Sequence, residues 1–439
     1  MKRSLLTNLR ILDPSSDVVL RENACITIED GAVVSIDDHP PANGTFDERI
    51  DFSGKVVLPG MINAHTHLYS ALALGMPGPK VKPFNFVQIL ERVWWKLDRA
   101  LDEKSTRASF RAGLLECLRH GVTTVIDHHS SPEFTRGSLA MLAEEAKALG
   151  IRISVAYEVT DRNGEDGFVS GVGENLAAWE RFHENPLVHP MFGLHASFTL
   201  SDDSLKRVGE ELKTREGLGI HIHLAEDQAD EGDARQRGYT SVVERLEHFG
   251  LLNKQGLVIH GLHIRLKDVQ TLKKAGMRLV HNPTSNANNR VGLLSKETIE
   301  AMQAGLGTDG MQAQMLAEAK EGTLIRSSHL AGGVSNVDYV HLLFGNNPAI
   351  ATHLFHHPVG RIAPGYSADF AIYDYDTRTP LSPDNVAGHL LFGIGEPTDV
   401  LSMGEFRLRD GRFIGIDEAG IQEDARRQSK RLWDAMEKL

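Results

Sequence analysis

Residues 54–67 read GKVVLPGMINAHTH, an apolar run that ends in two histidines, His65 and His67. Side chains two positions apart on a strand point to the same side, so both imidazoles would project together from the end of the strand. Such a pair packs at a strand end more often than it binds a metal ion. The rest of the chain therefore decides how this stretch is interpreted.

Seven further apolar segments follow this one and alternate with stretches of helical pattern. Eight strand–helix units in succession predict a distorted (β/α)8 barrel of the TIM type. A doubly wound sheet would give the same alternation, but polar residues fall at the C-terminal ends of many different strands, which favours the barrel. The expected strands cover residues 56–67, 122–129, 151–159, 189–198, 219–226, 257–264, 277–286 and 304–310.

The two ends of the chain differ from the middle and read as short strands with turns. Asp30-Gly31 and Asp410-Gly411 each separate two apolar runs, which is the pattern of a two-residue hairpin. We therefore expect a small composite β-sandwich from residues 1–56 and 360–415. The metal-dependent barrel would cover 57–359, and a C-terminal helix 416–439.

The expected fifth strand ends in His223 and is followed by Glu226. His221 faces the same side as His223 by the two-residue spacing, and His223 is the preferred ligand because it lies nearer the C-terminal end of the strand. Glu226 would then lie close enough to act on a ligand of the metal. Taken alone, Glu226 is better explained as a carboxylate favoured by a helix N-terminus.

Strands six, seven and eight end in His260, His281 and Asp309, respectively. Each of these residues is an ordinary polar group when taken alone. Together with the first and fifth strands, however, they deliver metal-binding or proton-carrying side chains to a single rim of the barrel. Their shared position favours one functional site.

Three imidazoles and one carboxylate suit a zinc-like or iron-like ion with one position left for water. Such an ion makes hydroxide available at neutral pH. Glu226 could carry protons to a leaving group, Asp309 could take the proton of the water, and His260 could hold hydroxide or an oxyanion. The predicted ligands are His65, His67, His223 and Asp309.

Composition limits the classes of function. The 439 residues carry a net charge of −12, which argues against a nucleic-acid binder, because such proteins usually present a basic face. The two cysteines, Cys25 and Cys117, form no CxxC pattern, which favours a reducing compartment. Since no apolar run is long enough for a signal peptide or a membrane span, we expect a cytoplasmic protein that binds no membrane.

These motifs resemble those of the amidohydrolase superfamily over nearly the whole chain. PGMINAHTH is similar to the first-strand motif of that family, which implies that His65 and His67 are metal ligands. HLAE resembles the fifth-strand ligand with its proton-shuttling glutamate, VIHG the sixth-strand histidine near the metal-bound water, and GLGTDG the eighth-strand aspartate. The corresponding residues here are His223, Glu226, His260 and Asp309.

Within the superfamily, the chain is most similar to the branch of cytosine, guanine and S-adenosylhomocysteine deaminases and triazine hydrolases, which use one metal ion. Binuclear relatives carry a carboxylated lysine at the fourth strand, whereas FGLHASFTL has no lysine here. The resemblance implies a single divalent ion, zinc with iron as the alternative. It also implies that His195 and His281 contact a small heterocyclic substrate.

One region departs from the pattern of the branch. After the first strand most members have an arginine-glycine turn, where this chain has LYSALALGMPGP and then FNFVQILERVWWKLDRALDEKS. This insertion resembles the SsnA-type aminohydrolases. Trp94 and Trp95 within it could roof the active site and stack on a flat ring, but packing of an amphipathic helix is the preferred explanation for both.

We expect a hydrolase of carbon–nitrogen bonds other than peptide bonds. The leading hypothesis is hydrolytic deamination of an aminated heterocycle such as a purine, in which Glu226 protonates a ring nitrogen and ammonia leaves. Hydrolysis of a ring amide or a carbon–halogen bond is an alternative, because fold and metal do not dictate the leaving group. A non-catalytic metal-binding protein is another. The branch also implies a homodimer.

Overall fold

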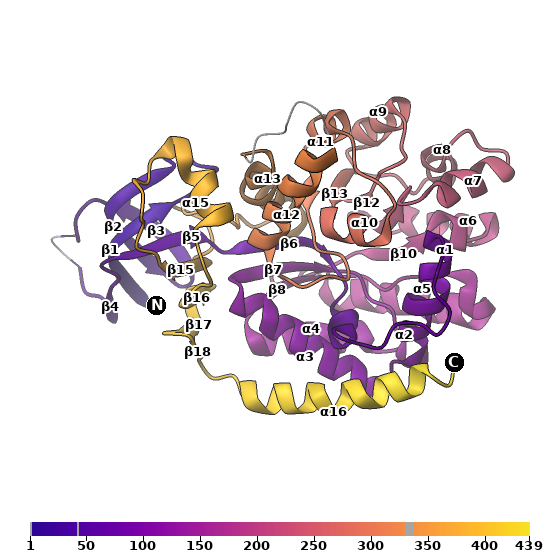
Figure 1. Cartoon of the computed structure of the whole chain (residues 1–439), viewed down its shortest axis with the longest axis horizontal. Coiled ribbons are helices and arrows are strands. Elements are labelled where there is room, and N and C mark those ends of the chain that lie inside the picture. The colour runs from indigo at the N-terminus through magenta and orange to yellow at the C-terminus, as the bar shows by residue number, and fades with distance from the viewer. Residues whose placement is uncertain (1, 42–43, 330–336) are drawn as a thin grey trace.

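The computed structural model describes residues 2–41, 44–329 and 337–439. Its centre is a closed barrel of parallel strands, in which the hydrogen-bonded orders β6-β7-β8-β9 and β10-β11-β12-β13-β14 are joined by bridges between Thr66 and Asp309 and between Val159 and Leu194 (Figure 1). The predicted TIM-like barrel is thus confirmed. Its strands are β6 (Met61–Thr66), β7 (Val122–Asp127), β8 (Arg152–Val155), β9 (Val188–Pro190), β10 (Phe192–Ala196), β11 (Ile220–Leu224), β12 (Leu257–His260), β13 (Arg278–His281) and β14 (Gly305–Leu306).

The barrel strands are buried almost throughout, as expected for parallel strands that are covered by helices on one face and filled by side chains on the other. β9 and β10 are successive parts of one strand position, separated at Met191. The helices between the strands include α3 (Glu103–Arg119), α4 (Ser138–Leu149), α5 (Gly164–Phe182), α6 (Asp202–Lys213), α7 (Gln228–Gln236), α8 (Val242–His248), α9 (Leu266–Ala275), α11 (Lys296–Met302) and α12 (Met315–His329).

The last barrel strand, β14, is only two residues long and depends on a side chain for its hydrogen bonds. The Asn347 amide, at the start of α14 (Asn347–Phe355), donates to the carbonyls of Ile62 and Leu306, both at 2.8 Å. The Leu306 N–H donates to Asn347 Oδ1 at 2.7 Å. One buried asparagine therefore joins β14 to β6, beside the backbone bridge between Thr66 and Asp309.

The two ends of the chain together form a second, mixed sheet of nine strands, on the left in Figure 1. Asp30-Gly31 and Asp410-Gly411 form the expected hairpin turns, with positive φ at both residues of each pair, as a type I′ turn requires. The strands are β1 (Arg3–Leu12), β2 (Leu20–Glu29), β3 (Ala32–Asp37), β4 (Glu48–Asp51), β5 (Lys55–Pro59), β15 (Phe370–Asp374), β16 (Asp399–Ser402), β17 (Glu405–Arg409) and β18 (Arg412–Phe413).

The stretch expected as one barrel strand over residues 56–67 is two strands in two sheets. β5 pairs with β15 and β1, whereas β6 pairs with β7 in the barrel. Gly60 makes the change of sheet, because a Cβ at this position would lie 2.5 Å from Thr123 Oγ1 and 3.0 Å from Asp369. The close approach of two other segments therefore explains the glycine.

A buried ion pair holds the sheet against the barrel. Arg152 on β8 donates to Asp369 Oδ2 at 2.9 Å, and both side chains are about 1% exposed. Asp369 also accepts the N–H of Met403 at Oδ1 (2.6 Å), and its carbonyl accepts the N–H of Gly60 at 2.7 Å. Removing either partner of such a pair would leave a buried charge uncompensated.

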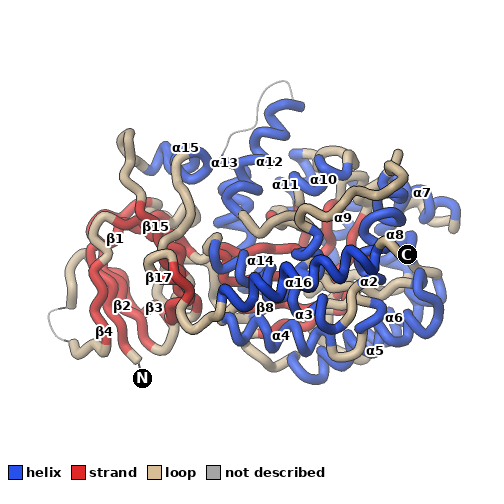
Figure 2. The backbone as a smooth tube through the Cα atoms, turned by 60° about the horizontal axis from the view of Figure 1, so that its bottom comes forward, coloured by secondary structure: helices blue, strands red, loops and turns tan. Residues whose placement is uncertain are grey.

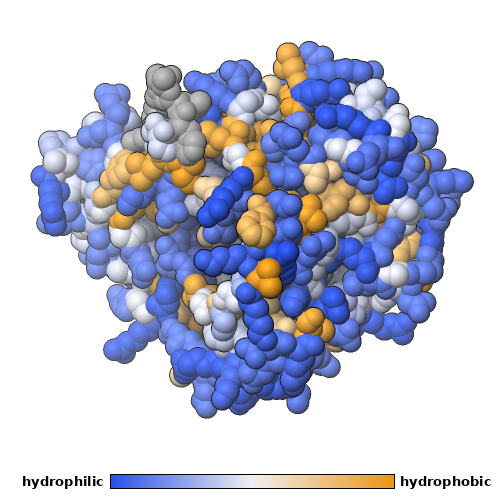
Figure 3. All heavy atoms as spheres, turned by 45° about the vertical axis from the view of Figure 1, so that its right-hand side comes forward, coloured by the Kyte–Doolittle hydropathy of each residue, from blue (hydrophilic) through white to orange (hydrophobic). Residues whose placement is uncertain are grey.

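The C-terminal helix α16 (Glu418–Met436) lies along the outside of the barrel beside α3 and α2 (Trp95–Ala100), as Figure 2 shows. Arg119 pairs with Glu418, and the Trp433 indole donates to the carbonyl of Leu72 at 2.9 Å. The molecular face in Figure 3 is mostly hydrophilic, with apolar residues in small scattered groups. Among the helices of the described ranges, none has the length and apolar character needed to cross a bilayer.

Candidate metal centre and active site

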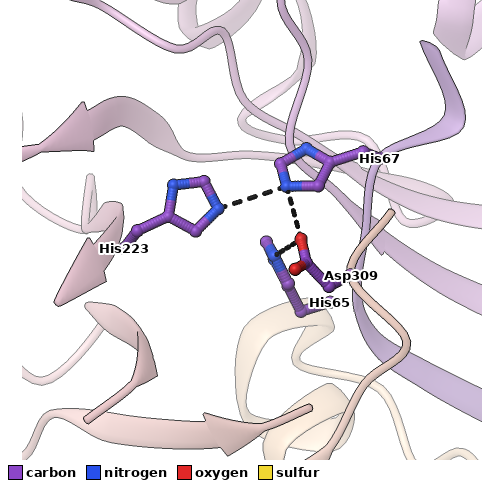
Figure 4. A group of neighbouring side chains, drawn as sticks. All are labelled: His65, His67, His223 and Asp309. Carbon is purple, nitrogen blue, oxygen red and sulfur yellow. Dashed lines mark hydrogen bonds and ion pairs between the residues drawn. The ribbon is translucent and has the colours of Figure 1, made fainter. Parts of the chain in front are cut away.

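Four predicted ligands converge at the C-terminal rim of the barrel. His65 and His67 belong to the end of β6, His223 to β11, and Asp309 follows β14; all four are buried, and one donor atom of each lies within 4.8 Å of the others. His67 Nε2 lies 2.9 Å from Asp309 Oδ1 and 3.2 Å from His223 Nε2, and His65 Nε2 lies 3.4 Å from Asp309 Oδ1. Figure 4 shows the four side chains pointing toward one another.

The backbone orients two of these imidazoles. His67 Nδ1 donates to the carbonyl of His128 at 2.6 Å, and His223 Nδ1 donates to the carbonyl of His195 at 2.8 Å. Histidine ligands of metals usually donate their second ring N–H in this way. In both rings Nε2 is left to face the common point, and His65 Nε2 is a buried atom without a hydrogen-bond partner in the described chain. The donor set therefore fits a divalent metal ion.

Left-handed backbone conformations end three of the strands that build this rim. Ala225 after β11, His260 at the end of β12 and Asp309 after β14 have φ values of 47°, 72° and 54°. Such conformations are costly for residues with a Cβ and cluster at functional sites. They turn the chain sharply, so that the strand-end side chains point over the rim.

Burial and Asp309 set the charge of the cluster. Burial lowers the pKa of His65 to about 3. Burial also acts to lower the pKa of His67, but the hydrogen bond and charge of Asp309 outweigh it and raise that pKa to about 9. Burial acts to raise the pKa of Asp309, yet its contacts with His65 and His67 hold it well below the usual range. Asp309 is thus a carboxylate, and an incoming cation would displace the proton of His67.

Glu226 and His260 lie beside the four-residue cluster. His260 Nε2 is 3.4 Å from Glu226 Oε2 and 3.9 Å from Asp309 Oδ2, and Asn289 donates to Glu226 Oε1 at 3.3 Å. Burial, with the charge of Asp309, raises the pKa of Glu226 well above its usual range. Burial lowers the pKa of His260 to about 4, so this ring is neutral. The structure therefore brings an acid that holds its proton to the edge of the metal cluster.

An aromatic pocket opens over the cluster. The space between its walls amounts to about 680 Å³ when the open solvent at its mouth is included. Trp94 and Trp95 both line it, so their role is not restricted to helix packing, which the sequence favoured. His195 also lines it, 6.1 Å from the Trp95 ring, and Arg162 lies over the same indole at 4.5 Å. A π-helix (η2, Leu90–Trp94) followed by α2 carries this aromatic wall.

His281 was expected to contact substrate, and the structure does not bring it to the pocket. Its ring is fully buried at the end of β13, 6.2 Å from the Tyr339 ring, and it is absent from the pocket lining. β13 ends at His281, α10 (Pro283–Asn289) begins two residues later, and Ser285 from that helix contacts Asp309. A contact between His281 and substrate stays a prediction.

Two acidic residues of the pocket wall escaped the sequence analysis. Glu158 follows β8 and lies 3.3 Å from His67 Nδ1, and its place at the end of an expected strand is a signal that the sequence contains. Asp98 comes from α2, where the sequence offers no such signal. It pairs with Arg162 at 3.2 Å through Oδ2, while its Oδ1 is buried without a hydrogen-bond partner in the described residues.

The fold and this site place the chain among metal-dependent hydrolases built on a TIM-like barrel. Residues 56–404 match the amidohydrolase family, and the chain belongs to that family. Its buried His/Asp cluster is therefore a metal site.

Known relatives span almost the whole chain. A 5-methylthioadenosine/S-adenosylhomocysteine deaminase from Thermococcus onnurineus (strain NA1) is 29% identical over 427 residues, covering 93% of this chain and 95% of the relative. An adenosine deaminase from Xanthomonas campestris with bound zinc superposes with a TM-score of 0.83 at 20% identity, covering 98% of each chain. The zinc complex of atrazine chlorohydrolase from Arthrobacter aurescens superposes with a TM-score of 0.82 at 19% identity, covering 97% of this chain and 100% of that one.

Proposed function

We propose that the protein is a hydrolytic deaminase of an aminated purine carried on a sugar. The observation that carries the proposal is the position of Glu226, whose Oε2 lies 3.4 Å from His260 Nε2 beside the metal cluster, in the wall of an aromatic pocket. A relative that is a 5-methylthioadenosine/S-adenosylhomocysteine deaminase supports an adenine nucleoside as the aminated heterocycle. The resemblance of the insertion to SsnA-type aminohydrolases stays a prediction.

We assign one divalent ion to His65, His67, His223 and Asp309, zinc with iron as the alternative. Imidazole and carboxylate donors suit both metals, and zinc occupies two of the superposed structures. When bound, the ion supplies a hydroxide nucleophile at neutral pH by lowering the pKa of a water molecule.

The side chains of the protein would then transfer the protons and hold the incoming oxygen. Glu226 delivers its proton to the ring nitrogen next to the carbon under attack, and His260 donates a hydrogen bond that holds the incoming oxygen. Asp309, a carboxylate, accepts a proton from the water. When this proton passes to the amino group, ammonia leaves, and the hydroxyl proton of the new C–O group returns to Glu226, so that the ring carries a carbonyl oxygen in place of the amine and Glu226 is an acid again.

The rest of the pocket supports a nucleoside rather than a bare base. Trp95 and His195 supply flat surfaces for a ring, and the buried Oδ1 of Asp98 is an acceptor without a donor in the described chain. An unpaired buried acceptor is costly, and a hydroxyl group of a sugar would satisfy it. We therefore propose Asp98 as a contact to the sugar of the substrate.

An ammonia assay with zinc-loaded protein tests the function. Adenosine, 5-methylthioadenosine and S-adenosylhomocysteine are compared with adenine, guanine, cytosine and an aminated triazine, and each product is weighed by mass spectrometry. We expect ammonia release and a mass gain of one unit with nucleosides, and slower turnover of adenine. A product that gains the full mass of water indicates ring opening. The absence of ammonia release with all of these compounds would contradict the proposal.

A further inference from the structure

The third histidine of the metal cluster, His65, is held differently from the other two. Its Nδ1 lies 3.0 Å from Nε2 of His221, a fully buried imidazole on β11. His67 and His223 use backbone carbonyls for the same purpose. The pocket lining does not include His221, so this ring lies behind the cluster and out of reach of a substrate.

An imidazole partner restricts the protonation of both rings. To bind a metal through Nε2, neutral His65 must carry its proton on Nδ1 and donate it to an acceptor. His221 Nε2 can accept only when its own proton lies on Nδ1. Unlike a carbonyl, which always accepts, His221 must therefore be present as one particular tautomer.

Packing fixes the plane of the His221 ring. The His128 ring stacks on it with centroids 4.3 Å apart and an angle of 12° between the planes, and both rings are 0% exposed. His221 also lies between Gly193 of β10 and Leu257 of β12 in the strand register. The strands thus set the position of His221, and His128 sets its tilt.

We propose that His221 is a positioning residue that orients His65 and selects its metal-binding tautomer, and this proposal rests on the proposed metal centre. One competing arrangement exists on the same atoms. His65, His128 and His221 each offer a nitrogen, and the three lie within 4.8 Å of one another. In that arrangement His221 would itself be a ligand of a second ion.

Two amide substitutions with different reach separate these roles. In His221→Gln the side-chain oxygen reaches the place of Nε2 and can accept from His65, whereas in His221→Asn the amide ends one bond short. The readouts are Zn²⁺ affinity, from competition with a chromophoric chelator, and the visible spectrum of the Co²⁺-substituted protein. His189→Asn is the matched control, because His189 is another buried histidine on a barrel strand and lies away from the metal cluster.

We expect His221→Asn to weaken Zn²⁺ binding about 10- to 100-fold, the range typical for lost partners of metal ligands. His221→Gln should bind Zn²⁺ nearly as tightly as the wild type, and His189→Asn should leave the affinity unchanged. Equal losses in His221→Gln and His221→Asn would overturn the positioning role. The positioning role would also be overturned if the wild-type chain bound two Zn²⁺ ions and each variant bound only one, because His221 would then be a metal ligand.

The outcome is independent of the substrate. Weaker Zn²⁺ binding in His221→Asn but not in His221→Gln supports the inference even if no nucleoside is deaminated. If the wild type deaminates nucleosides and both variants bind Zn²⁺ as it does, the inference fails and the proposed function stands. The far-ultraviolet circular dichroism of each variant shows that the compared proteins are folded.

Discussion

Glu226 is the residue on which the proposed chemistry depends most. Glu226→Gln keeps the shape of the side chain but removes the transferable proton, so we expect kcat to fall by roughly 10²- to 10⁴-fold. Zinc content should not change, because Glu226 is outside the ligand set. Steady-state kinetics and metal analysis measure both quantities. Glu231→Gln, a change at another buried glutamate in the same segment, is the control, and undiminished turnover in Glu226→Gln would contradict the proton role.

The buried carboxyl group of Glu318 makes the stability of the folded protein depend on pH. Burial raises its pKa from 4.5 to about 8, although Thr284 donates to it through both N–H and hydroxyl. The folded state therefore holds this proton more tightly than the unfolded state, so the contribution of Glu318 is complete below pH 4.5 and is lost as the pH rises through about 8.

Glu318→Gln, which imitates the protonated acid, tests this linkage. We expect the difference in Tm, variant minus wild type, to increase from pH 5 to pH 9, because only the wild type loses the contribution of Glu318 over that interval. Differential scanning calorimetry at several pH values measures it. A difference that does not vary with pH would show that Glu318 titrates normally.

The positions of single residues explain which members of the site could be predicted from the sequence. His65, His223 and Asp309 could be predicted because each follows an apolar strand, and strand ends of a barrel share one rim. Asp98 could not, since it lies on an inserted helix whose approach to the pocket is a matter of tertiary packing. The sequence also could not show that His281 lies outside the pocket lining, because tertiary packing decides which strand-end side chains reach the pocket.

At the scale of elements, the chain pattern predicted where the barrel strands lie but not where their hydrogen bonds stop. Residues 304–310 were expected as a strand, but β14 covers only Gly305–Leu306. Beyond it, Asp309 forms a single bridge with Thr66 and has a left-handed backbone conformation. A two-residue strand needs support from outside, and Asn347 provides it from a segment that sequence periodicity does not connect to β14.

Asn347→Leu should therefore destabilise the closure of the barrel. It removes three buried hydrogen bonds that each contribute about 1 kcal/mol, with a further cost for the backbone groups left unpaired, so we expect a loss of roughly 3 kcal/mol or more in the free energy of unfolding. Urea unfolding measures the loss. Asn346→Leu, where a single bond to the Ala304 carbonyl is removed, is the control, and an equal loss in both variants would contradict the role of Asn347.

For the whole molecule, the metal site joins distant parts of the barrel. β6, β11 and the chain after β14 meet at one cluster, so an ion that binds only the folded state stabilises all of them together. Chelation should lower Tm by about 5 °C if zinc is otherwise present at about a thousandfold excess over its Kd. Zinc should restore Tm and magnesium should not, because magnesium prefers oxygen ligands. A Tm that does not change on chelation would contradict the proposed metal site.

Assembly as a homodimer stays a prediction, which light scattering can address.

Asp369 connects the start of the first metal-binding strand to a part of the chain that is synthesised much later. Gly60, at the start of the strand that carries His65, and Arg152 are both held by Asp369, which the ribosome adds long after them, and Asp369 in turn binds Met403. The first metal-binding strand therefore gains its final anchorage only when the later part of the chain has been synthesised. We expect the nascent barrel to remain incomplete until then, so that the metal ion is loaded after translation rather than during it.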